Sequence, residues 1–273
     1  MKTLIHISDL HFGKINNAIT VPLISAFSSI KPDMVIISGD LTQRAKIKEF
    51  KGAKAFLDDI KNEGLKYLVI PGNHDIEPLF KPLKRIANPF DKYKKFISED
   101  IEPVYFDNEV AIASINTARP SNLKGGGISV KQIKKVEMWF SLFSDSIIKI
   151  IVTHHPFDLP MLYHAKKLVP TAKKVIEQFS SQNIDLYLSG HYHRSSVITT
   201  SERFNIGENN AIAIQAGTLS VRERGEVQSF NVIKVDSSKI VIETYLCDQE
   251  AMIFKVSSIK SFEHAEGQWR ILK

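Results

Sequence analysis

Five apolar runs of this 273-residue sequence each end in a short polar block that contains Asp, Asn or His. Short apolar runs bounded by turn-forming residues are typical of buried β-strands. In open α/β sheets, ligands bind outside the carboxyl ends of the strands. The sequence therefore predicts strands whose polar ends converge on one rim. The five blocks are Ser8-Asp9-Leu10-His11, Ser38-Gly39-Asp40, Pro71-Gly72-Asn73-His74-Asp75, Thr153-His154-His155-Pro156 and Ser189-Gly190-His191-Tyr192-His193.

Helix-like stretches alternate with the strand-like runs before Gly190, and strands without long helices follow it. This pattern predicts an α/β (α+β) fold with an antiparallel second part in one sheet system. We expect a single domain over residues 1–273, because no linker or repeat interrupts it. The Lys- and Pro-rich segment near 78–100 is interpreted as a cap insertion, and the tail from about 253 is ambiguous. Strands are predicted at 3–7, 34–38, 66–70, 104–106, 110–115, 147–152, 184–188, 197–200, 211–215, 230–235 and 240–246, and helices at 15–30, 43–62, 130–143 and 171–181.

The composition limits the compartment and the cofactor chemistry. A single cysteine, Cys247, excludes an internal disulfide and a cysteine-based zinc or iron–sulfur site. The N-terminus becomes polar too soon for a signal peptide, and no apolar run approaches the ~20 residues of a membrane span. We therefore expect a cytoplasmic protein. The net charge of +6 fits either a polyanionic partner or scattered solvated lysines, and the sequence leaves both readings open.

The residue types in the polar blocks suit a metal centre. Asp9 and His11 are two residues apart, as are His191 and His193, so in extended backbone each pair would point the same way and reach a common site. Glycines at 39, 72 and 190 would let the backbone turn tightly there. Mixed imidazole and oxygen donors without thiolate indicate Mn, Fe, Zn or Co.

Any one of these blocks alone is more often a surface accident or a turn than a site. The ordered set, however, resembles the calcineurin-like metallophosphoesterase superfamily, whose pattern is Asp-x-His, Gly-Asp, Gly-Asn-His-Asp/Glu, His and Gly-His-x-His. The matching positions run from Asp9 to His193. The resemblance is closest to the class III cyclic-nucleotide phosphodiesterase branch. It implies a four-layer αββα sandwich with two divalent or mixed-valence metal ions at its rim.

The resemblance also implies a ligand assignment in which Asp40 bridges the two ions. His154 is assigned in preference to His155, because Ile151-Val152-Thr153-His154 matches the family's Val-x-x-His pattern; His155 is then a supporting or substrate-facing residue. One ion would take Asp9, His11, Asp40 and His193, and the other Asp40, Asn73, His154 and His191.

Three further residues are candidates for catalysis. The family assigns the histidine at the position of His74 to catalysis, either as the acid that protonates the leaving group or as an oxyanion stabiliser. Asp75 either orients His74 or serves as a turn carboxylate. Arg119 either binds a phosphate oxygen or is a surface arginine. Arg222 and Arg224 are weaker candidates in a loop expected near the rim.

The function implied by this set is hydrolysis of a phosphodiester, with a cyclic or small nucleotide favoured, by a metal-bound hydroxide. A phosphomonoesterase, a lipid-nucleotide pyrophosphatase or a nuclease would use the same centre, although the small size disfavours the nuclease. A binding scaffold would lack ligands, and none is missing. We expect a small phosphoester partner and no stable nucleic acid partner. The Lys-rich residues 81–95 keep membrane contact open, and the oligomeric state is not predicted.

Overall fold

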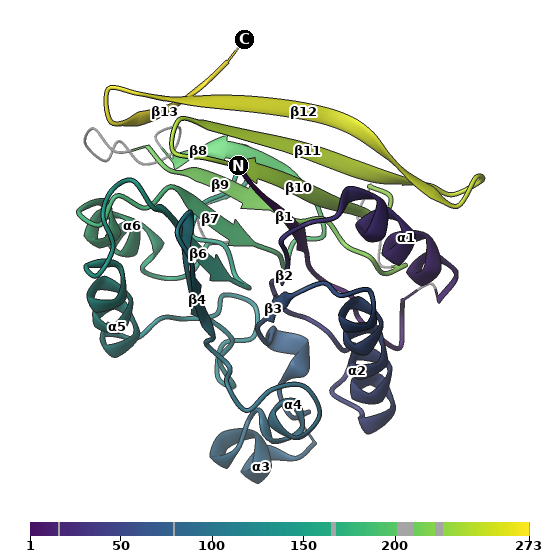
Figure 1. The fold of residues 1–273 in the computed structure, drawn as a ribbon. Helices are drawn as coiled ribbons and strands as arrows, with labels where there is room; N and C mark the ends of the chain where they lie inside the picture. Colours follow the sequence, from purple (N-terminus) through teal and green to yellow (C-terminus); the bar gives the residue numbers. More distant parts are fainter. Residues whose placement is uncertain (16, 79, 165–167, 201–209, 222–225, 273) are drawn as a thin grey trace.

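The computed structural model describes residues 1–15, 17–78, 80–164, 168–200, 210–221 and 226–272, which form two β-sheets and the helices that cover them (Figure 1). In the described residues the first sheet has seven strands in the order β13-β12-β11-β10-β1-β2-β3 and the second has six in the order β4-β5-β6-β7-β9-β8. The strands are β1 Lys2–Ile7, β2 Met34–Ile37, β3 Tyr67–Val69, β4 Val104–Phe106, β5 Val110–Ile115, β6 Ile148–Thr153, β7 Leu186–Ser189, β8 Ser196–Thr199, β9 Ile212–Gln215, β10 Ser229–Val235, β11 Lys239–Asp248, β12 Ile253–Ala265 and β13 Gln268–Ile271.

The helices lie on the outer faces of the two sheets. In Figure 1, α1 and α2 cover the first sheet on the right and α5 and α6 cover the second on the left, while α3 and α4 project below. The α-helices are α1 Thr20–Ile30, α2 Ile47–Asn62, α3 Pro82–Ala87, α4 Asp91–Phe96, α5 Val130–Phe140 and α6 Ala172–Ser180, and the 3-10 turns are η1 Asn17–Ile19 and η2 Asn73–Asp75.

Alternating side chains of the central strands divide the core into layers. In β2, Val35 packs into the cluster beneath α1 and α2, whereas Ile36 packs into the cluster between the two sheets. In β6, Ile150 enters the cluster between the sheets and Ile151 enters the one beneath α5 and α6. Successive side chains of a strand point to opposite faces, so each strand that is buried on both sides reads as a continuous apolar run. The structure thus confirms the αββα sandwich.

Parallel pairing brings the polar strand ends together. Strands β1, β2 and β3 are mutually parallel in the first sheet, and β5, β6, β7 and β9 are parallel in the second. The carboxyl ends of both parallel groups meet at one edge of the sandwich. Backbone hydrogen bonds tie neighbouring ends together: Asp9 N donates to Gly39 O at 3.0 Å and Gly190 N donates to His154 O at 3.1 Å. The rim is therefore shared by two sheets.

The structure changes three details of the predicted layout. Helix α2 begins at Ile47 and not at 43, because Glu49 accepts hydrogen bonds from the backbone N–H groups of Arg44 and Lys46 and ends the Asp40 loop there. The strands after Gly190 are not one antiparallel group: β9 pairs in parallel with β7, and β10 to β13 extend the first sheet. The ambiguous tail forms β12 and β13, and the segment near 78–100 contains α3 and α4. The single domain stays a prediction.

Candidate metal centre

The carboxylate of Asp40 lies at the middle of the rim, between two groups of donor atoms. Its Oδ2 atom is 3.7 Å from Nε2 of His11 on one side and 3.4 Å from Nε2 of His154 on the other. Its Oδ1 atom accepts a hydrogen bond of 2.7 Å from the backbone N–H of His74, which fixes the carboxylate plane. Asp40 is 1% exposed. One oxygen is thus anchored, and the other faces both donor groups.

The first donor group contains Asp9, His11 and His193, which follow β1 and β7. Nε2 of His193 is 3.2 Å from Oδ1 of Asp9 and 3.0 Å from Nε2 of His11. Asp9 Oδ1 is buried and accepts no hydrogen bond from the residues that the structure describes, even though two imidazole nitrogens face it. Buried oxygens are seldom left without a donor or a cation. These three side chains therefore fit a metal ion.

The second donor group contains Asn73, His154 and His191. The side-chain oxygen of Asn73 is 3.0 Å from Nε2 of His154 and 3.0 Å from Nδ1 of His191. Asn73 opens the turn η2 after β3, and the two histidines follow β6 and β7. Together with Asp40 they supply two nitrogens and two oxygens, a donor set of the same mixed type as the first.

Backbone carbonyls accept hydrogen bonds from the second ring nitrogen of the inward-facing histidines. Nδ1 of His154 is 2.8 Å from Ser38 O, and Nε2 of His191 is 3.0 Å from Lys124 O. Nδ1 of His11 is 3.3 Å from Thr42 O. Histidines that bind metals commonly donate their other N–H to such a group, which fixes the tautomer and turns a lone pair toward the ion. The arrangement is the one that a metal site requires.

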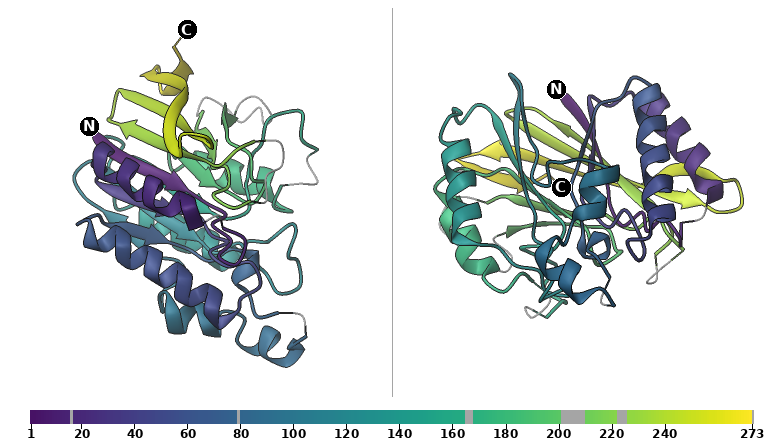
Figure 2. Two further views of the ribbon diagram at one scale, coloured as in Figure 1. Left: turned by 90° about the vertical axis from the view of Figure 1, so that its right-hand side faces the viewer. Right: turned by 90° about the horizontal axis from the view of Figure 1, so that it is seen from below.

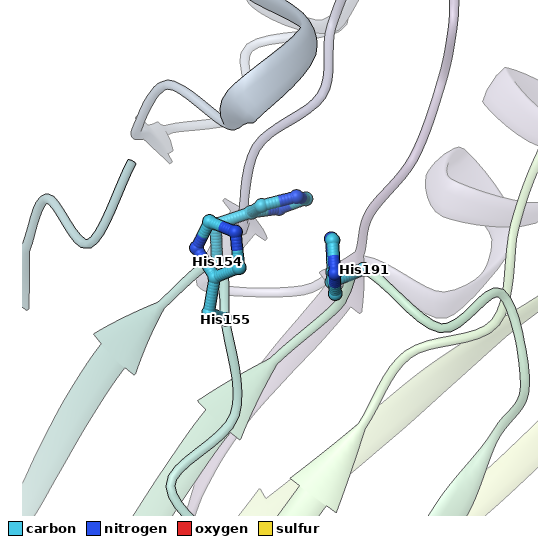
Figure 3. Close-up of side chains that lie close together, drawn as sticks. All are labelled: His154, His155 and His191. Atoms are coloured by element: carbon cyan, nitrogen blue, oxygen red, sulfur yellow. The ribbon is translucent and has the colours of Figure 1, made fainter. Parts of the chain in front are cut away.

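His154 and His155 are neighbours after β6, and both lie near His191 (Figure 3). In His155, Nδ1 is 3.0 Å from the hydroxyl oxygen of Thr117 and Nε2 is 3.1 Å from Leu123 O, so both of its nitrogens have partners outside the donor groups. In His154, Nε2 faces Asp40 and Asn73. The geometry thus favours His154 as the ligand and His155 as the residue that anchors the loop after β5.

Five of the seven expected ligands have backbone angles that L-residues seldom adopt. The φ angles are 55° at Asp9, 46° at His11, 54° at Asp40, 79° at His191 and 60° at His193. Each residue held in the left-handed region costs roughly 1–2 kcal/mol, and such strain clusters at functional sites. The backbone is therefore not extended there. The expectation from spacing holds for Asp9 and His11 but fails for His191 and His193, whose rings face different donor groups.

Close backbone approaches explain the glycines of the polar blocks. A Cβ atom on Gly72 would lie 2.1 Å from Oδ1 of Asp40, and one on Gly190 would lie 1.8 Å from the hydroxyl oxygen of Ser8. No side chain fits at such distances. The two glycines therefore let the loops after β3 and β7 reach the carboxylates of the centre.

The buried carboxylates depend on neighbouring positive charge. Burial opposes ionisation of Asp9 and of Asp40, yet the histidines beside them hold the pKa of both carboxyl groups below the usual range. Burial alone would lower the pKa of His154, but Asp40 outweighs it and raises that pKa to about 9. Burial lowers the pKa of His191 to about 4. A site that keeps two buried carboxylates charged fits cations.

His74 lies at the open side of the centre. Its Nε2 atom is 4.0 Å from Asp40 Oδ2, and its side chain is 27% exposed. Its Nδ1 atom is 2.7 Å from the backbone oxygen of Gln43, which orients the ring. No sequence pattern points to Gln43, because a backbone carbonyl can come from any residue. His74 thus stands beside both donor groups with one nitrogen turned toward them.

Asp75 makes the hydrogen bonds of a turn carboxylate. Its oxygens accept from the backbone N–H groups of Leu41, Thr42 and Gly72 at 2.8 to 3.1 Å, and from the hydroxyl of Thr42 at 2.9 Å. Burial and the charge of Asp40 raise the pKa of Asp75 to about 6, against the lowering effect of these hydrogen bonds. Asp75 therefore joins the Asp40 loop to the Asn73 turn, and the carbonyl of Gln43 meets the ring of His74.

Arg119 is held by its own loop. One terminal nitrogen donates to Asn116 O at 2.7 Å and to Ala118 O at 3.0 Å, and the other donates to the side-chain oxygen of Gln132 at 2.5 Å. Burial lowers the pKa of Arg119. These contacts support a loop-fixing role, and phosphate binding by Arg119 stays a prediction. The candidates Arg222 and Arg224 lie outside the described residues.

A groove of about 600 Å³ borders the centre at Asn73 and His74. Its apolar lining includes Ile76, Phe80 and Leu123, and its cationic lining includes Arg44, Lys46 and Lys81. The groove thus joins the rim to the segment that contains α3. A ligand that reached the metal centre could extend along it.

Comparison with known proteins decides the family. The sequence model of the family described as "Calcineurin-like phosphoesterase" matches residues 2–195, which contain every expected ligand. The chain belongs to the calcineurin-like phosphoesterase family. Family membership confirms the resemblance read from the polar blocks.

Two curated relatives carry phosphodiesterase names. A probable glycerophosphodiester phosphodiesterase of Arcobacter nitrofigilis is 26% identical over 171 residues, which are 61% of this chain and 58% of that protein. A probable cyclic nucleotide phosphodiesterase of Ruthia magnifica is 28% identical over 168 residues, 58% of this chain and 63% of that one. The chain thus spans about three-fifths of the length of either relative.

A solved structure confirms the fold. The purple acid phosphatase PPD1 from yellow lupin (Lupinus luteus) seeds superposes with a TM-score of 0.70 at 13% identity, covering 95% of this chain and 53% of that protein. At so low an identity the likeness speaks for the architecture alone.

Proposed function

We propose that the chain is a dinuclear metal-dependent phosphodiesterase whose substrate is a cyclic or small nucleotide. The observation that carries the proposal is the position of Asp40 Oδ2, which faces His11 on one side and His154 on the other. One carboxylate oxygen between two separate donor groups is the arrangement that a bridging ligand needs. Two relatives with phosphodiesterase names support the reaction class.

The donor groups define how the ions would be held. One ion takes Asp9, His11, Asp40 and His193, and the other takes Asp40, Asn73, His154 and His191. Mn, Fe, Zn and Co all accept such mixed nitrogen and oxygen donors, so a divalent or mixed-valence pair of them is proposed. When bound, such a pair would lower the pKa of a water molecule so that its hydroxide form can attack phosphorus, and it would supply positive charge for the phosphate oxygens.

The side chains around the ions do the rest of the work. Asp9 and Asp40 contribute two negative charges against the charge of two divalent ions, so the centre keeps a net attraction for a phosphate ester. The anchored Oδ1 of Asp40 and the carbonyl-bound histidines hold the ligand atoms in place before substrate arrives. Prearranged donors need no reorganisation during the reaction.

His74 is proposed to protonate the leaving oxygen. Because its Nδ1–H faces the carbonyl of Gln43, the proton available for transfer is the one on Nε2 of the imidazolium form. That atom lies on the side of Asp40 and borders the groove. General acid help of this kind contributes ~10²–10⁴ in rate.

The groove favours a diester over a monoester. A diester carries a second ester substituent besides the leaving group. The groove beside His74 offers apolar walls and cations to that second arm. A nucleoside suits both features, since its base is flat and partly apolar. A phosphomonoesterase and a lipid-nucleotide pyrophosphatase remain the alternatives with the same centre.

A pair of chromogenic substrates tests the proposal. Protein stripped of metal and reloaded with Mn²⁺ should bind two ions per chain and hydrolyse bis-p-nitrophenyl phosphate with a higher kcat/KM than p-nitrophenyl phosphate at the same pH. Both release p-nitrophenolate, so the ratio reports the charge and the second arm. A clear preference for the monoester would replace the diesterase by a phosphatase. Full turnover by protein shown to be metal-free would end the metal mechanism.

A further inference from the structure

We propose that the segment around α3 and α4 docks this protein on the surface of an anionic lipid bilayer. The surface concerned, called here the α3–α4 face, consists of the apolar side chains Phe80, Leu83 and Ile86 and the basic side chains Lys81, Lys84, Lys94 and Lys95. It lies outside the donor groups of the metal centre, and lipid binding does not require the reaction proposed above.

The apolar side chains of the face are among the most exposed of the described residues. Phe80 is 80% exposed, Leu83 84% and Ile86 76%. Leu83 and Ile86 are three residues apart and therefore lie on one side of α3, and Phe80 precedes the helix by two residues. On the other side, Arg85 is buried and donates to the backbone oxygens of Glu77 and Pro120. The helix is therefore fixed with its apolar side outward, and exposed apolar clusters mark interaction sites.

Charge is concentrated in the same segment. Residues 80–98 contain six Lys or Arg and one Asp, a net of +5, while the whole chain carries +6. Two of the cations are used internally, since Arg85 holds α3 and Lys92 binds Glu77 and the backbone oxygen of Ala45. The lysines at 81, 84, 94 and 95 are exposed. Lys81 and Lys84 thus neighbour the apolar side chains in the sequence, and Lys94 and Lys95 add positive charge on α4.

The combination identifies the occupant as an anionic membrane. Basic residues around large apolar side chains are the features by which peripheral proteins bind acidic bilayers, the apolar groups entering the headgroup region and the lysines meeting lipid phosphates. A symmetric contact with a second copy would set these lysines against the same lysines, which repel. A soluble polyanion would leave the apolar side chains in water.

The location of the face gives docking a consequence for the site. Phe80 and Lys81 also line the groove that borders Asn73 and His74. Figure 1 and the left view of Figure 2 show α3 projecting from the sandwich. Among the described residues, no helix is long and apolar enough to cross a bilayer. Docking would turn the groove toward the lipid headgroups.

Vesicle binding by the full chain tests the inference without reference to hydrolysis. Metal-free protein is sedimented with vesicles of phosphatidylcholine alone or of phosphatidylcholine mixed with phosphatidylglycerol. We expect binding to the mixed vesicles, release as salt is raised, and about tenfold weaker binding of Leu83→Asp/Ile86→Asp and of Lys84→Glu/Lys94→Glu. Leu142→Asp, at a position 73% exposed after α5, and Lys48→Glu on α2 are the matched controls and should bind as the wild type.

Three outcomes would overturn the inference. The first is no binding of the wild type to the mixed vesicles, or equal binding to neutral ones. The second is an equal loss in the control variants. The third is self-association of the wild type in sedimentation velocity that Leu83→Asp/Ile86→Asp abolishes, which would make the face a homodimer surface. Neither Leu83 nor Ile86 lines the groove, so this variant should keep hydrolysing water-soluble bis-p-nitrophenyl phosphate; failure of that reaction in the wild type would count against the proposed function instead.

Discussion

The rim of the sandwich and the α3–α4 face lie next to each other but are built in opposite ways. At the rim, side chains such as Asp9, His11 and His154 are completely buried, and hydrogen bonds or tight turns fix each of the loops that carry them. On the α3–α4 face, Phe80 and Leu83 are largely exposed, and α3 is tied to the body mainly through Arg85.

This difference separates two tasks. Ligands of the proposed metal pair would have to be positioned within a fraction of an ångström, and strained residues and close-packed glycines fix the rim. Selecting a substrate arm or a surface needs accessible groups whose exact placement matters less. We therefore expect substitutions at the rim to abolish hydrolysis. Substitutions in the α3 segment should instead alter which substrates or surfaces the protein binds.

The largest expected effect is that of Asp40→Ala. Without the shared carboxylate, neither donor group keeps its full set, so metal content should fall and kcat/KM should drop roughly 10⁴-fold or more. Metal analysis and diester hydrolysis measure the two effects. Asp58→Ala is the control, because Asp58 pairs with Lys54 at the surface of α2. Normal activity in Asp40→Ala would show that the centre lies elsewhere.

His74→Ala separates two roles within the rim. His74 is proposed to donate a proton in the reaction, whereas the donor groups are proposed to bind the metal ions. Metal content should stay normal, while kcat for diesters with poor leaving groups should fall by ~10²–10⁴. The loss of kcat should be smaller for diesters that release p-nitrophenolate, because this group leaves without a proton. Equal losses on good and poor leaving groups would mean that His74 stabilises the phosphoryl oxygens instead.

The sequence predicted the donor residues better than it predicted their surroundings. Asp40 and His154 were found because each follows an apolar run, and parallel pairing does bring such ends together. The spacing argument failed at His191 and His193, because the ring of His191 faces Asn73 and that of His193 faces Asp9. The extended backbone that it assumed is absent at Asp9 and His11 as well, since all four residues have positive φ. That the rim is divided between two sheets came from the resemblance and not from the periodicity.

Side-chain partners were the part that the sequence could not supply. Arg119 follows a strand as a phosphate-binding residue would, but Gln132 of α5 accepts its hydrogen bond. His74 is oriented by the carbonyl of Gln43, and a carbonyl has no sequence signature. Likewise, the sequence showed lysines at 81 and 84 but not that Leu83 and Ile86 beside them would be exposed. Contacts of this kind depend on tertiary packing, which local pattern does not encode.

The next largest effect should come from Asp75→Ala, which removes the link between two rim loops. Four hydrogen bonds from Leu41, Thr42 and Gly72 lose their acceptor, so the free energy of unfolding should fall by ~3 kcal/mol. Denaturant titration of metal-free protein measures the loss. Asp107→Ala, which removes a carboxylate from a partly exposed turn, is the comparison and should cost less. If Asp75→Ala left stability unchanged and lowered kcat mainly for poor leaving groups, as expected for His74→Ala, Asp75 would instead act through His74.

The smallest expected effect, at Phe80, decides whether the α3 segment selects substrates at all. Phe80 is 80% exposed in the free protein and lines the groove, so an aromatic second arm could cover part of it. Removing that ring should cost about 1 kcal/mol of binding, or roughly fivefold in kcat/KM, for bis-p-nitrophenyl phosphate. Methyl p-nitrophenyl phosphate has the same leaving group but a small second arm, so Phe80→Ala should hydrolyse it at the wild-type rate. Leu83→Ala is the matched control, because Leu83 is equally exposed on α3 and does not line the groove. If Phe80→Ala lowered kcat/KM equally for both diesters, or lowered the metal content, the α3 segment would be part of the rigid rim. The rim and the α3–α4 face would then not have separate roles.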